Sequence, residues 1–502
     1  MLARRRAAPH DRRRTDRSEA LLRSSPMVTR PARRLPVVLA VVGLLVFGTV
    51  AARLHANHGV TGDEPHYLVM TYSLIKDGDF DVKNDYALQR YHSYYPGNLD
   101  PGFRVNPDLF KPTSPHIYLV DGVGLPALIA PFVAVAGPRG ASAVLIAVAL
   151  LVLLLVWRWT LLVTHDERAA LFATLVVFVS VGFIGLAGYI FPDMILAALL
   201  LGGLILAEGP EPTPRSALLL GALAAMSFWF HLKFAAPFGL LVSIAAIRWW
   251  TQLRADPHRY TRLFVPLAAP IAVSASVYLV VNHAWFGVWN PLRIYPHFIS
   301  IFAIDPLVSI PAMAIDKTKG LLATSPIFLL VALGLPLWAK AAKPQLIRVA
   351  LVLVPSFVLL ATFVDWWGGF APAGRYPMEF MPALAPAAGL ALARLRSPVL
   401  RGAAILLAVY QVALTTLTLA WNTGWVDLGE RTLVFTRIQK ATGIPLDAPL
   451  PSFASTLLPH FRTYLVHGNL LKAIAAGAIA VAVLGVGMVA AREVPGADPD
   501  AR

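Results

Sequence analysis

Long apolar stretches recur along nearly the whole chain, separated by short basic segments and by longer polar ones. A helix needs about 20 mostly apolar residues to cross a bilayer, and the stretches have about that length, some of them less. The pattern predicts an all-α polytopic membrane protein with about twelve transmembrane helices. The predicted spans are 36–54, 140–162, 168–188, 193–207, 216–232, 234–250, 263–285, 320–339, 346–365, 379–394, 399–421 and 469–491.

One further apolar stretch, 118–136, does not fit this series. Pro126 and Pro131 interrupt it, and it carries Asp121. Counting it as a span would also move the basic segment 158–168 to the other side of the membrane, against the charge distribution of the remaining loops. We therefore expect it to form a helix that lies on, or dips into, the outer surface.

The basic residues indicate the orientation. With the Arg-rich segment 1–35 placed in the cytoplasm, the short segments that also fall inside are nearly all rich in Arg or Lys, as cytoplasmic loops usually are. They are 158–168, 208–215, 248–262, 340–348 and 394–401. Both chain ends are then cytoplasmic, with polar and disordered tails at 1–35 and 492–502.

The long polar loops all face the extracytoplasmic side in this arrangement. They comprise 55–117, 282–319, 365–378 and 422–468. The predicted organisation is a catalytic membrane core at 36–394, whose first external loop is 55–117, followed by C-terminal helices at 395–491. The functional site should therefore be built on the external face of a bacterial-type plasma membrane.

Composition supports a membrane protein and argues against a soluble chain, a nucleic-acid partner and cysteine chemistry. Of the 502 residues, 57% are hydrophobic and only 14% charged, which is more apolar surface than a soluble chain could bury. The net charge of +15 is concentrated in cytoplasmic segments and does not indicate a nucleic-acid partner. Because the chain has no cysteine, thiol catalysis and Cys-based metal sites are excluded.

Two adjacent carboxylates, Asp63 and Glu64, follow the first predicted span directly. A partly desolvated carboxylate at the membrane edge can act as a general base and take a proton from an acceptor hydroxyl. Asp63 could equally cap the helix that begins near Pro65, because Asp is a favoured cap. The two interpretations are compatible.

The segment from Asp63 onward resembles the first external loop of the GT-C membrane glycosyltransferases. The resemblance rests on the Asp-Glu pair, Tyr67, the triplet 73–75 and the Asp-Gly-Asp-Phe run 77–80. The similar branch includes dolichyl-phosphate-mannose protein mannosyltransferases and the aminoarabinose transferase that acts on lipid A. It implies that Asp63 is the catalytic carboxylate, with Glu64 as its partner or an alternative base. His66 and Tyr67 would belong to the loop that meets donor or acceptor.

Three later elements also resemble this family. Lys111-Pro112 is similar to a Lys-Pro-Pro-x-x-Tyr element, with an insertion, which implies that Lys111 binds the donor phosphate; it could instead be an interfacial lysine. Asp193 is similar to a second external acidic site, although it could also cap the following helix. Arg375-Tyr376 is similar to a late Arg-Tyr-x-x-Pro element. Arg375 suits a phosphate because guanidinium groups bind phosphate oxygens in pairs, but it could also anchor the loop at the headgroups, with Tyr376 in an interfacial belt.

Other cations could add positive charge at the same face. His231 and Lys233 lie at the outer end of a span, and Arg293, Lys317 and Lys319 lie in the 282–319 loop. We rank all five below Arg375 as phosphate ligands. No His spacing typical of metal ligands occurs, so we expect no dedicated metal site and no firm cofactor. A divalent cation bridging Asp63 or Glu64 to a phosphate remains an open alternative.

The resemblance implies a glycosyltransferase that moves a sugar from a polyprenyl-phosphate donor to an extracytoplasmic hydroxyl, with inversion. The acceptor could be a protein, a glycolipid or a cell-wall glycan, and membrane lipid would surround the enzyme. The alternative from another class is a secondary transporter or lipid flippase, which would place ionisable groups near mid-span and show repeated broken helices.

Overall fold

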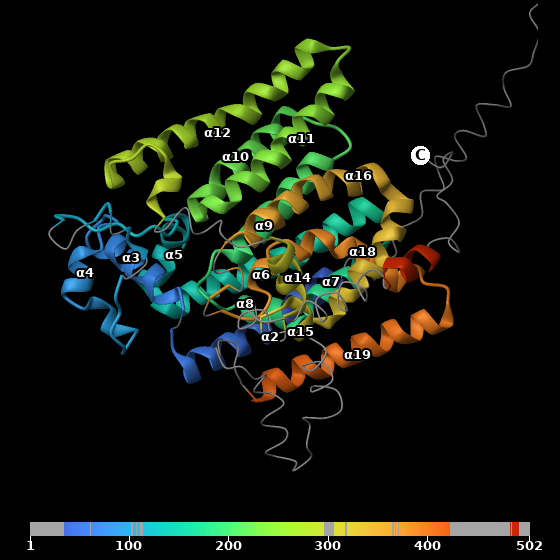
Figure 1. Ribbon diagram of the computed structural model, residues 1–502, viewed down its shortest axis with the longest axis horizontal. Coiled ribbons are helices and arrows are strands. Elements are labelled where there is room, and N and C mark those ends of the chain that lie inside the picture. Colours follow the sequence, from blue (N-terminus) through green and yellow to red (C-terminus); the bar gives the residue numbers. More distant parts are fainter. Residues whose placement is uncertain are drawn as a thin grey trace, which may run out of the picture. The chain divides into compact units, whose positions relative to one another are not determined.

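The computed structural model describes residues 35–60, 62–101, 104–106, 108–110, 114–295, 306–316, 319–363, 366, 368–369, 371–421, 482 and 484–490. The described residues are helical and contain no strand (Figure 1). Residues up to Val42 form a separate contact unit, so the packing below concerns Gly43 onward. The predicted tails, the external loop 422–468 and most of the last predicted span lie outside the described residues.

The helices follow the predicted spans closely, with shorter helices between them. They are α2 (Leu35–His58), α3 (Glu64–Lys76), α4 (Lys83–Ala87), α5 (Gly124–Ala136), α6 (Pro138–Thr164), α7 (Glu167–Phe178), α8 (Val181–Leu186), α9 (Asp193–Glu208), α10 (Pro214–Phe230), α11 (Ala235–Leu253), α12 (Pro257–Phe286), α14 (Pro306–Ile315), α15 (Leu321–Thr324), α16 (Leu329–Ala361), α17 (Arg375–Met378), α18 (Met381–Arg394) and α19 (Pro398–Trp421). Short 3₁₀ turns occur at η2 (Arg90–Ser93), η4 (Leu232–Phe234), η5 (Pro291–Ile294) and η6 (Pro326–Phe328).

Within the described residues, five helical segments are long and apolar enough to cross a bilayer. They are Pro138–Thr164, Leu232–Leu253, Pro257–Ile294, Pro326–Ala361 and Pro398–Leu417. The chain is an integral membrane protein with an all-α fold, as predicted. The count of about twelve spans stays a prediction.

One predicted span and one predicted loop differ in detail from the observed helices. The stretch 168–188 is not one helix, because the chain breaks at Val179 and Ser180 between α7 and α8. The predicted loop 340–348 is almost wholly helical instead: α16 runs through it and bends at Ala342, whose backbone is non-helical (φ −153°, ψ 57°). A single residue thus makes the corner between the two apolar halves of α16.

Helix α5 fills the stretch 118–136 that was not counted as a span. Its 13 residues rise about 20 Å, less than the roughly 30 Å of a hydrocarbon core, so α5 alone cannot cross it. It packs against α3 and α6. Its position at the outer surface stays a prediction.

Close helix packing forms the protein core around α18, which contacts α7, α16 and α6. Glycines allow the backbones to approach. A Cβ atom on Gly334 of α16 would lie 1.8 Å from the carbonyl oxygen of Ala387, and one on Gly389 would lie 2.1 Å from that of Ala169. Small residues at such crossings are typical of helices packed within membranes.

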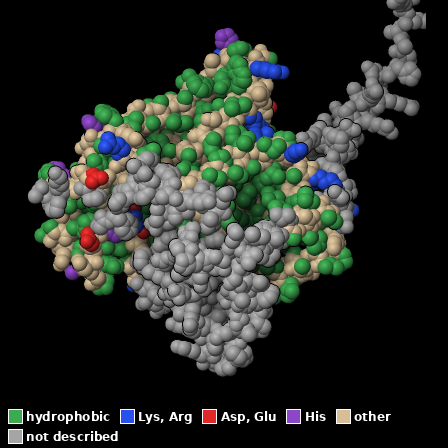
Figure 2. Space-filling view, viewed as in Figure 1, with side chains coloured by type: hydrophobic (Ala, Val, Ile, Leu, Met, Phe, Trp, Pro, Cys, Tyr) green, Lys and Arg blue, Asp and Glu red, His purple; other side chains and the backbone are tan. Residues whose placement is uncertain are grey.

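Helix α12 contrasts with this core. It packs on α10, yet only 6% of its most apolar window is buried. Val273, Val277 and Val280 are exposed on its outer face. Figure 2 shows apolar side chains over much of the surface formed by α10, α11 and α12. A lipid-facing helix explains this exposure.

Candidate active site

Asp63 lies between two arginines that are distant from it in sequence. Its Oδ1 atom accepts a hydrogen bond from Nη2 of Arg104, and its Oδ2 atom accepts one from Nη1 of Arg375 at 2.8 Å. Burial alone would raise the pKa of Asp63, but the charges of Arg104 and Arg375 outweigh it and hold the pKa well below the usual range. The carboxylate is therefore ionised, and 17% of the side chain remains exposed.

The capping interpretation of Asp63 is not what the structure shows. Asp63 occupies the N-cap position of α3, with Pro65 in the first turn, but its side chain caps no backbone N–H group. Both carboxylate oxygens bind guanidinium groups instead. The helix start thus positions Asp63 at a charged cluster.

Arg375 links Asp63 to Asp193. Its Nε atom donates to Oδ1 of Asp193 at 3.0 Å, and its Nη1 atom also donates to the carbonyl of Gly368 at 3.2 Å. The guanidinium carbon lies 4.2 Å from the ring centroid of Phe191, a cation–π distance. Burial lowers the pKa of Arg375, but Asp193 and Asp63 more than offset this and raise it well above the ordinary value.

The loop before Arg375 is held in place by Lys319. The Nζ atom of Lys319 donates to the carbonyls of Gly369 at 3.2 Å and Ala371 at 2.8 Å. Gly374, next to Arg375, has a left-handed backbone (φ 74°), and a Cβ there would come within 3.0 Å of Leu321. The sequence suggested Lys319 as a cation that could bind the donor phosphate. In the structure its ammonium group binds this loop instead.

Asp193 starts α9 but does not cap it, since Pro192 holds the N-cap position. Its carboxylate is buried and lies beside both Arg375 and Glu379. Asp193 serves mainly as a partner of Arg375. A negative charge in the first turn of α9 is also favoured by the helix dipole.

Glu64 binds a backbone group of the segment before α9. Its Oε1 atom accepts a hydrogen bond from the backbone N–H of Ile190 at 2.9 Å, and the side chain is buried. This bond ties the start of α3 to the segment that leads into Asp193. The geometry favours a positioning role for Glu64 over that of an alternative base.

Lys233 and His231 lie in a neighbouring buried group. The Nζ atom of Lys233 pairs with Oε1 of Glu379 at 2.5 Å and lies 4.3 Å from the ring centroid of Tyr376. His231 accepts a hydrogen bond from the backbone N–H of Lys233 at 3.3 Å. The ammonium group is thus already paired with a carboxylate, which weakens the case for Lys233 as a phosphate ligand.

His66 and Tyr67 lie in the first turn of α3 and face the interior of the segment between α2 and α5. The Nδ1 atom of His66 lies 2.8 Å from the hydroxyl of Tyr86. Burial and the nearby charge of Arg104 lower the pKa of His66 to about 4, so its ring is neutral at ordinary pH. Tyr67 is buried.

The sequence reasoning missed three members of the cluster. Arg104 holds Asp63 and also Asp121, whose Oδ1 atom accepts from its Nη1 atom at 2.5 Å. Asp121 was read only as an interruption of an apolar stretch. Glu379 opens a predicted span, and an acid there was a usable signal of function. No local pattern would have found Arg104.

Other candidates lie apart or outside. Lys111 and Lys317 are outside the described residues. Arg293 accepts a hydrogen bond at its backbone carbonyl from Asn106, at 2.8 Å. In the described part of the chain, no group of three or more His, Asp or Glu side chains is arranged to hold a metal ion. Whether a divalent cation takes part stays a question for experiment.

Neither a protein-family model nor a curated protein matches the sequence. Solved structures do. The crystal structure of ArnT from Cupriavidus metallidurans bound to undecaprenyl phosphate matches with a TM-score of 0.50 at 16% identity, over 91% of this chain and 77% of that one. The apo oligosaccharyltransferase of Archaeoglobus fulgidus matches with a TM-score of 0.44 at 12% identity, over 84% and 59%. The chain has the GT-C fold, as the sequence resemblance implied.

Proposed function

We propose that the protein is a glycosyltransferase that moves a sugar from a polyprenyl-phosphate donor to an acceptor hydroxyl outside the membrane. The observation that carries the proposal is the partly exposed Asp63 carboxylate held between Arg104 and Arg375. A carboxylate base beside two guanidinium groups is the chemistry that a phosphate leaving group and a hydroxyl nucleophile require. The GT-C fold, and the undecaprenyl phosphate bound to ArnT, support a lipid-linked donor.

The reaction would be a single displacement. The acceptor oxygen forms a bond to the anomeric carbon while the bond from that carbon to the phosphate oxygen breaks, and the phosphate leaves with the electron pair. The acceptor proton passes to Asp63. Attack opposite the leaving group inverts the anomeric centre.

The two arginines would act on both partners. In the arrangement described, their charges make Asp63 a weak base. A donor phosphate that bound Arg104 or Arg375 would draw charge away from Asp63 and raise its pKa toward a useful value. Donor binding would thus switch on the base. Lys111 would contribute to phosphate binding from the same external loop.

The site would lie on the extracytoplasmic face, with both termini in the cytoplasm. The acceptor would be a protein, a glycolipid or a cell-wall glycan, reached from outside. Sugar identity, hexose or pentose, would be set by groups next to Asp63 rather than by Asp63 itself.

The test uses the full chain in lipid nanodiscs with radiolabelled polyprenyl-phosphate sugars and crude envelope acceptor. We expect the wild type to transfer label and Asp63→Asn to lose at least 100-fold in rate, as loss of a general base usually causes. Both proteins should elute as the same monodisperse peak, which controls for folding. Wild-type-like transfer by Asp63→Asn would exclude Asp63 as the base. If the wild type neither binds nor consumes any donor, transport becomes the better explanation.

A further inference from the structure

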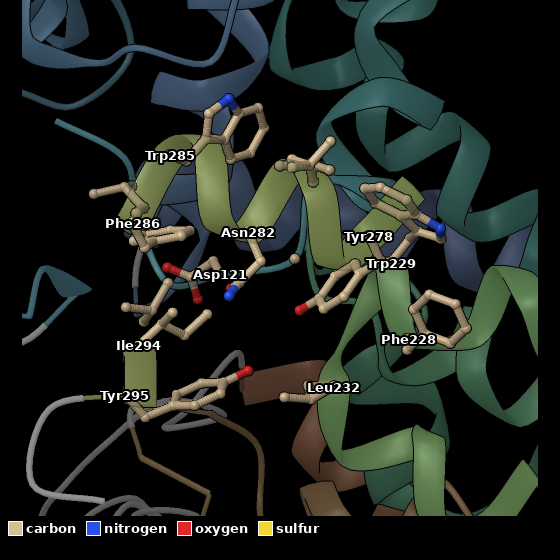
Figure 3. Close-up of a pocket in the computed structure, with 15 residues that line it drawn as sticks. Asp121, Phe228, Trp229, Leu232, Tyr278, Asn282, Trp285, Phe286, Ile294 and Tyr295 are labelled. Carbon is tan, nitrogen blue, oxygen red and sulfur yellow. The ribbon is translucent and has the colours of Figure 1, made fainter. Parts of the chain in front are cut away.

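An open pocket lies next to the charged cluster, between α12 and the end of α10 (Figure 3). Neither Asp63 nor Arg375 lines it. Residues 119–123, at the end of the first external loop, form one wall. Leu232, Ile294 and Tyr295 lie along its lower side in Figure 3. The cavity is therefore a separate space that the proposed displacement has not yet used.

Two buried polar side chains face this cavity with unused hydrogen-bonding capacity. Asp121 is 7% exposed; its Oδ1 atom binds Arg104, and its Oδ2 atom has no partner among the described residues. Asn282 is 3% exposed; its amide nitrogen donates to the carbonyl of Val288, and its Oδ1 atom has no partner in the same part of the chain. Buried polar atoms without partners are costly and call for an explanation.

The rest of the lining is aromatic with polar tips. Figure 3 shows the hydroxyl groups of Tyr278 and Tyr295 pointing into the same space as Asp121 and Asn282. Tyr278, Asn282 and Phe286 are four residues apart along α12, so they share one face of that helix. The opposite face carries the exposed valines. The helix thus presents lipid with one side and this cavity with the other.

This lining selects among the chemical groups of the proposed substrates. A phosphate would be repelled by the Asp121 carboxylate. An isoprenoid tail would leave the oxygens of Asp121 and Asn282 unpaired. A sugar ring satisfies both requirements, because its hydroxyls donate to the two oxygens while its C–H face packs on the aromatic rings.

Asp121 also connects the cavity to the proposed base. It shares Arg104 with Asp63, so a single guanidinium separates the cavity wall from the carboxylate. A sugar ring that binds Asp121 is therefore held at a fixed position relative to Asp63. This linkage gives the cavity a reason to lie where it does.

Resting on the proposed function, we propose that this cavity binds a sugar ring of the substrate, with Asp121 and Asn282 accepting hydrogen bonds from its hydroxyls. Asp121 and the two tyrosines would then determine specificity for the sugar. The ring could belong to the donor or to a glycan acceptor, and the experiment separates the two.

The test compares Tyr278→Phe/Tyr295→Phe with Tyr260→Phe, a matched loss of a hydroxyl at the other end of α12. Probes are undecaprenyl phosphate alone and undecaprenyl phosphates carrying glucose, mannose or arabinose, bound to the full chain in nanodiscs. For a donor ring, the double variant should lose at least 10-fold in affinity for one sugar-bearing lipid and less than twofold for the bare lipid. For an acceptor ring, donor affinity should hold while the acceptor KM rises at least fivefold. Asp121→Asn should act in the same direction.

Several results would overturn the proposal. One is a double variant that matches Tyr260→Phe in both donor affinity and acceptor KM. Another is an equal loss of bare and sugar-bearing lipid, which would make the cavity a tail or phosphate site. Both presuppose an active wild type, so they leave the proposed glycosyl transfer standing. A wild type that binds no prenyl phosphate and transfers no label would instead remove the proposed function, and this inference with it.

Discussion

Helix α9 carries one acid at each end, and the two are used in opposite ways. Glu208, at its C-terminal end, forms a two-pronged pair with Arg348, with both N–O distances at 2.6 Å and the arginine side chain 26% exposed. Asp193, at the other end, accepts a hydrogen bond from Nε of Arg375, which is 6% exposed and also serves Asp63. The Glu208 pair is geometrically complete.

The difference separates a structural ion pair from a functional one. The Glu208 pair, with its carboxylate 6% and its arginine 26% exposed, joins the two partners by two short hydrogen bonds and ties α9 to α16. Arg375 is buried and divides its hydrogen bonds between two carboxylates. The cost of removing such a charge from water offsets the attraction, so this arrangement adds little to stability. Such arrangements are usually kept for what they do to a substrate.

Replacing each arginine by lysine tests most strongly whether the two ion pairs differ in function. Arg375→Lys should lower the transfer rate by about 100-fold or more, because one ammonium cannot serve Asp63, Asp193 and a phosphate at once. The matched change Arg348→Lys should leave the rate within twofold. Transfer rates of the two variants in the nanodisc assay decide the matter. Equal losses in both would show that the two ends of α9 do not differ in function.

A smaller effect concerns pH and His66 of α3, which lies near Arg104 of the charged cluster. His66 has a pKa lowered to about 4, so the unfolded chain, with a His pKa near 6.5, binds more protons below pH 6.5 than the folded one. Stability is therefore complete above about pH 6.5 and falls as the pH drops toward 4, by up to about 3 kcal/mol.

Thermal melting of the wild type and His66→Asn between pH 7.5 and 4.5 measures this effect. The variant should lose part of the decline, because it removes the group that must become charged while buried. A decline of the same size in both proteins would assign it to other groups.

The smallest expected effect lies at the Glu208 end of α9. Glu208→Gln should lower the free energy of unfolding by about 1 kcal/mol, because Gln can still accept a hydrogen bond from Arg348, whose side chain is 26% exposed. Transfer should not change. Denaturation midpoints and rates of the purified variant check both statements. A loss of transfer would show that the proposed structural pair takes part in catalysis.

The sequence predicted the helical membrane fold because apolar length is a local property. It also pointed to Asp63, Asp193 and Arg375, since an acid or arginine beside a span is costly enough to stand out. It did not predict that these residues are in contact, because Arg375 lies 312 positions after Asp63 and no local pattern connects them. Arg104 and Asp121 were missed because their significance lies in tertiary pairing alone. The sequence predicted a break between two spans at 340–348, and the structure places the bend at Ala342 within that segment while keeping most of it helical.

Because α12 is exposed on one side, the shape of the cavity that it lines should depend on bilayer thickness. One wall of the cavity is a helix that packs on α10 and leaves its other side exposed, and Pro266 and Pro270 interrupt its hydrogen-bond ladder. Its tilt is therefore set by its packing on α10, and the thickness of the surrounding acyl chains acts on it through the exposed side. Thinner or thicker membranes would change the spacing between Tyr278 and the opposite wall without altering any side chain. The lipid is, in this sense, a structural component of the recognition site.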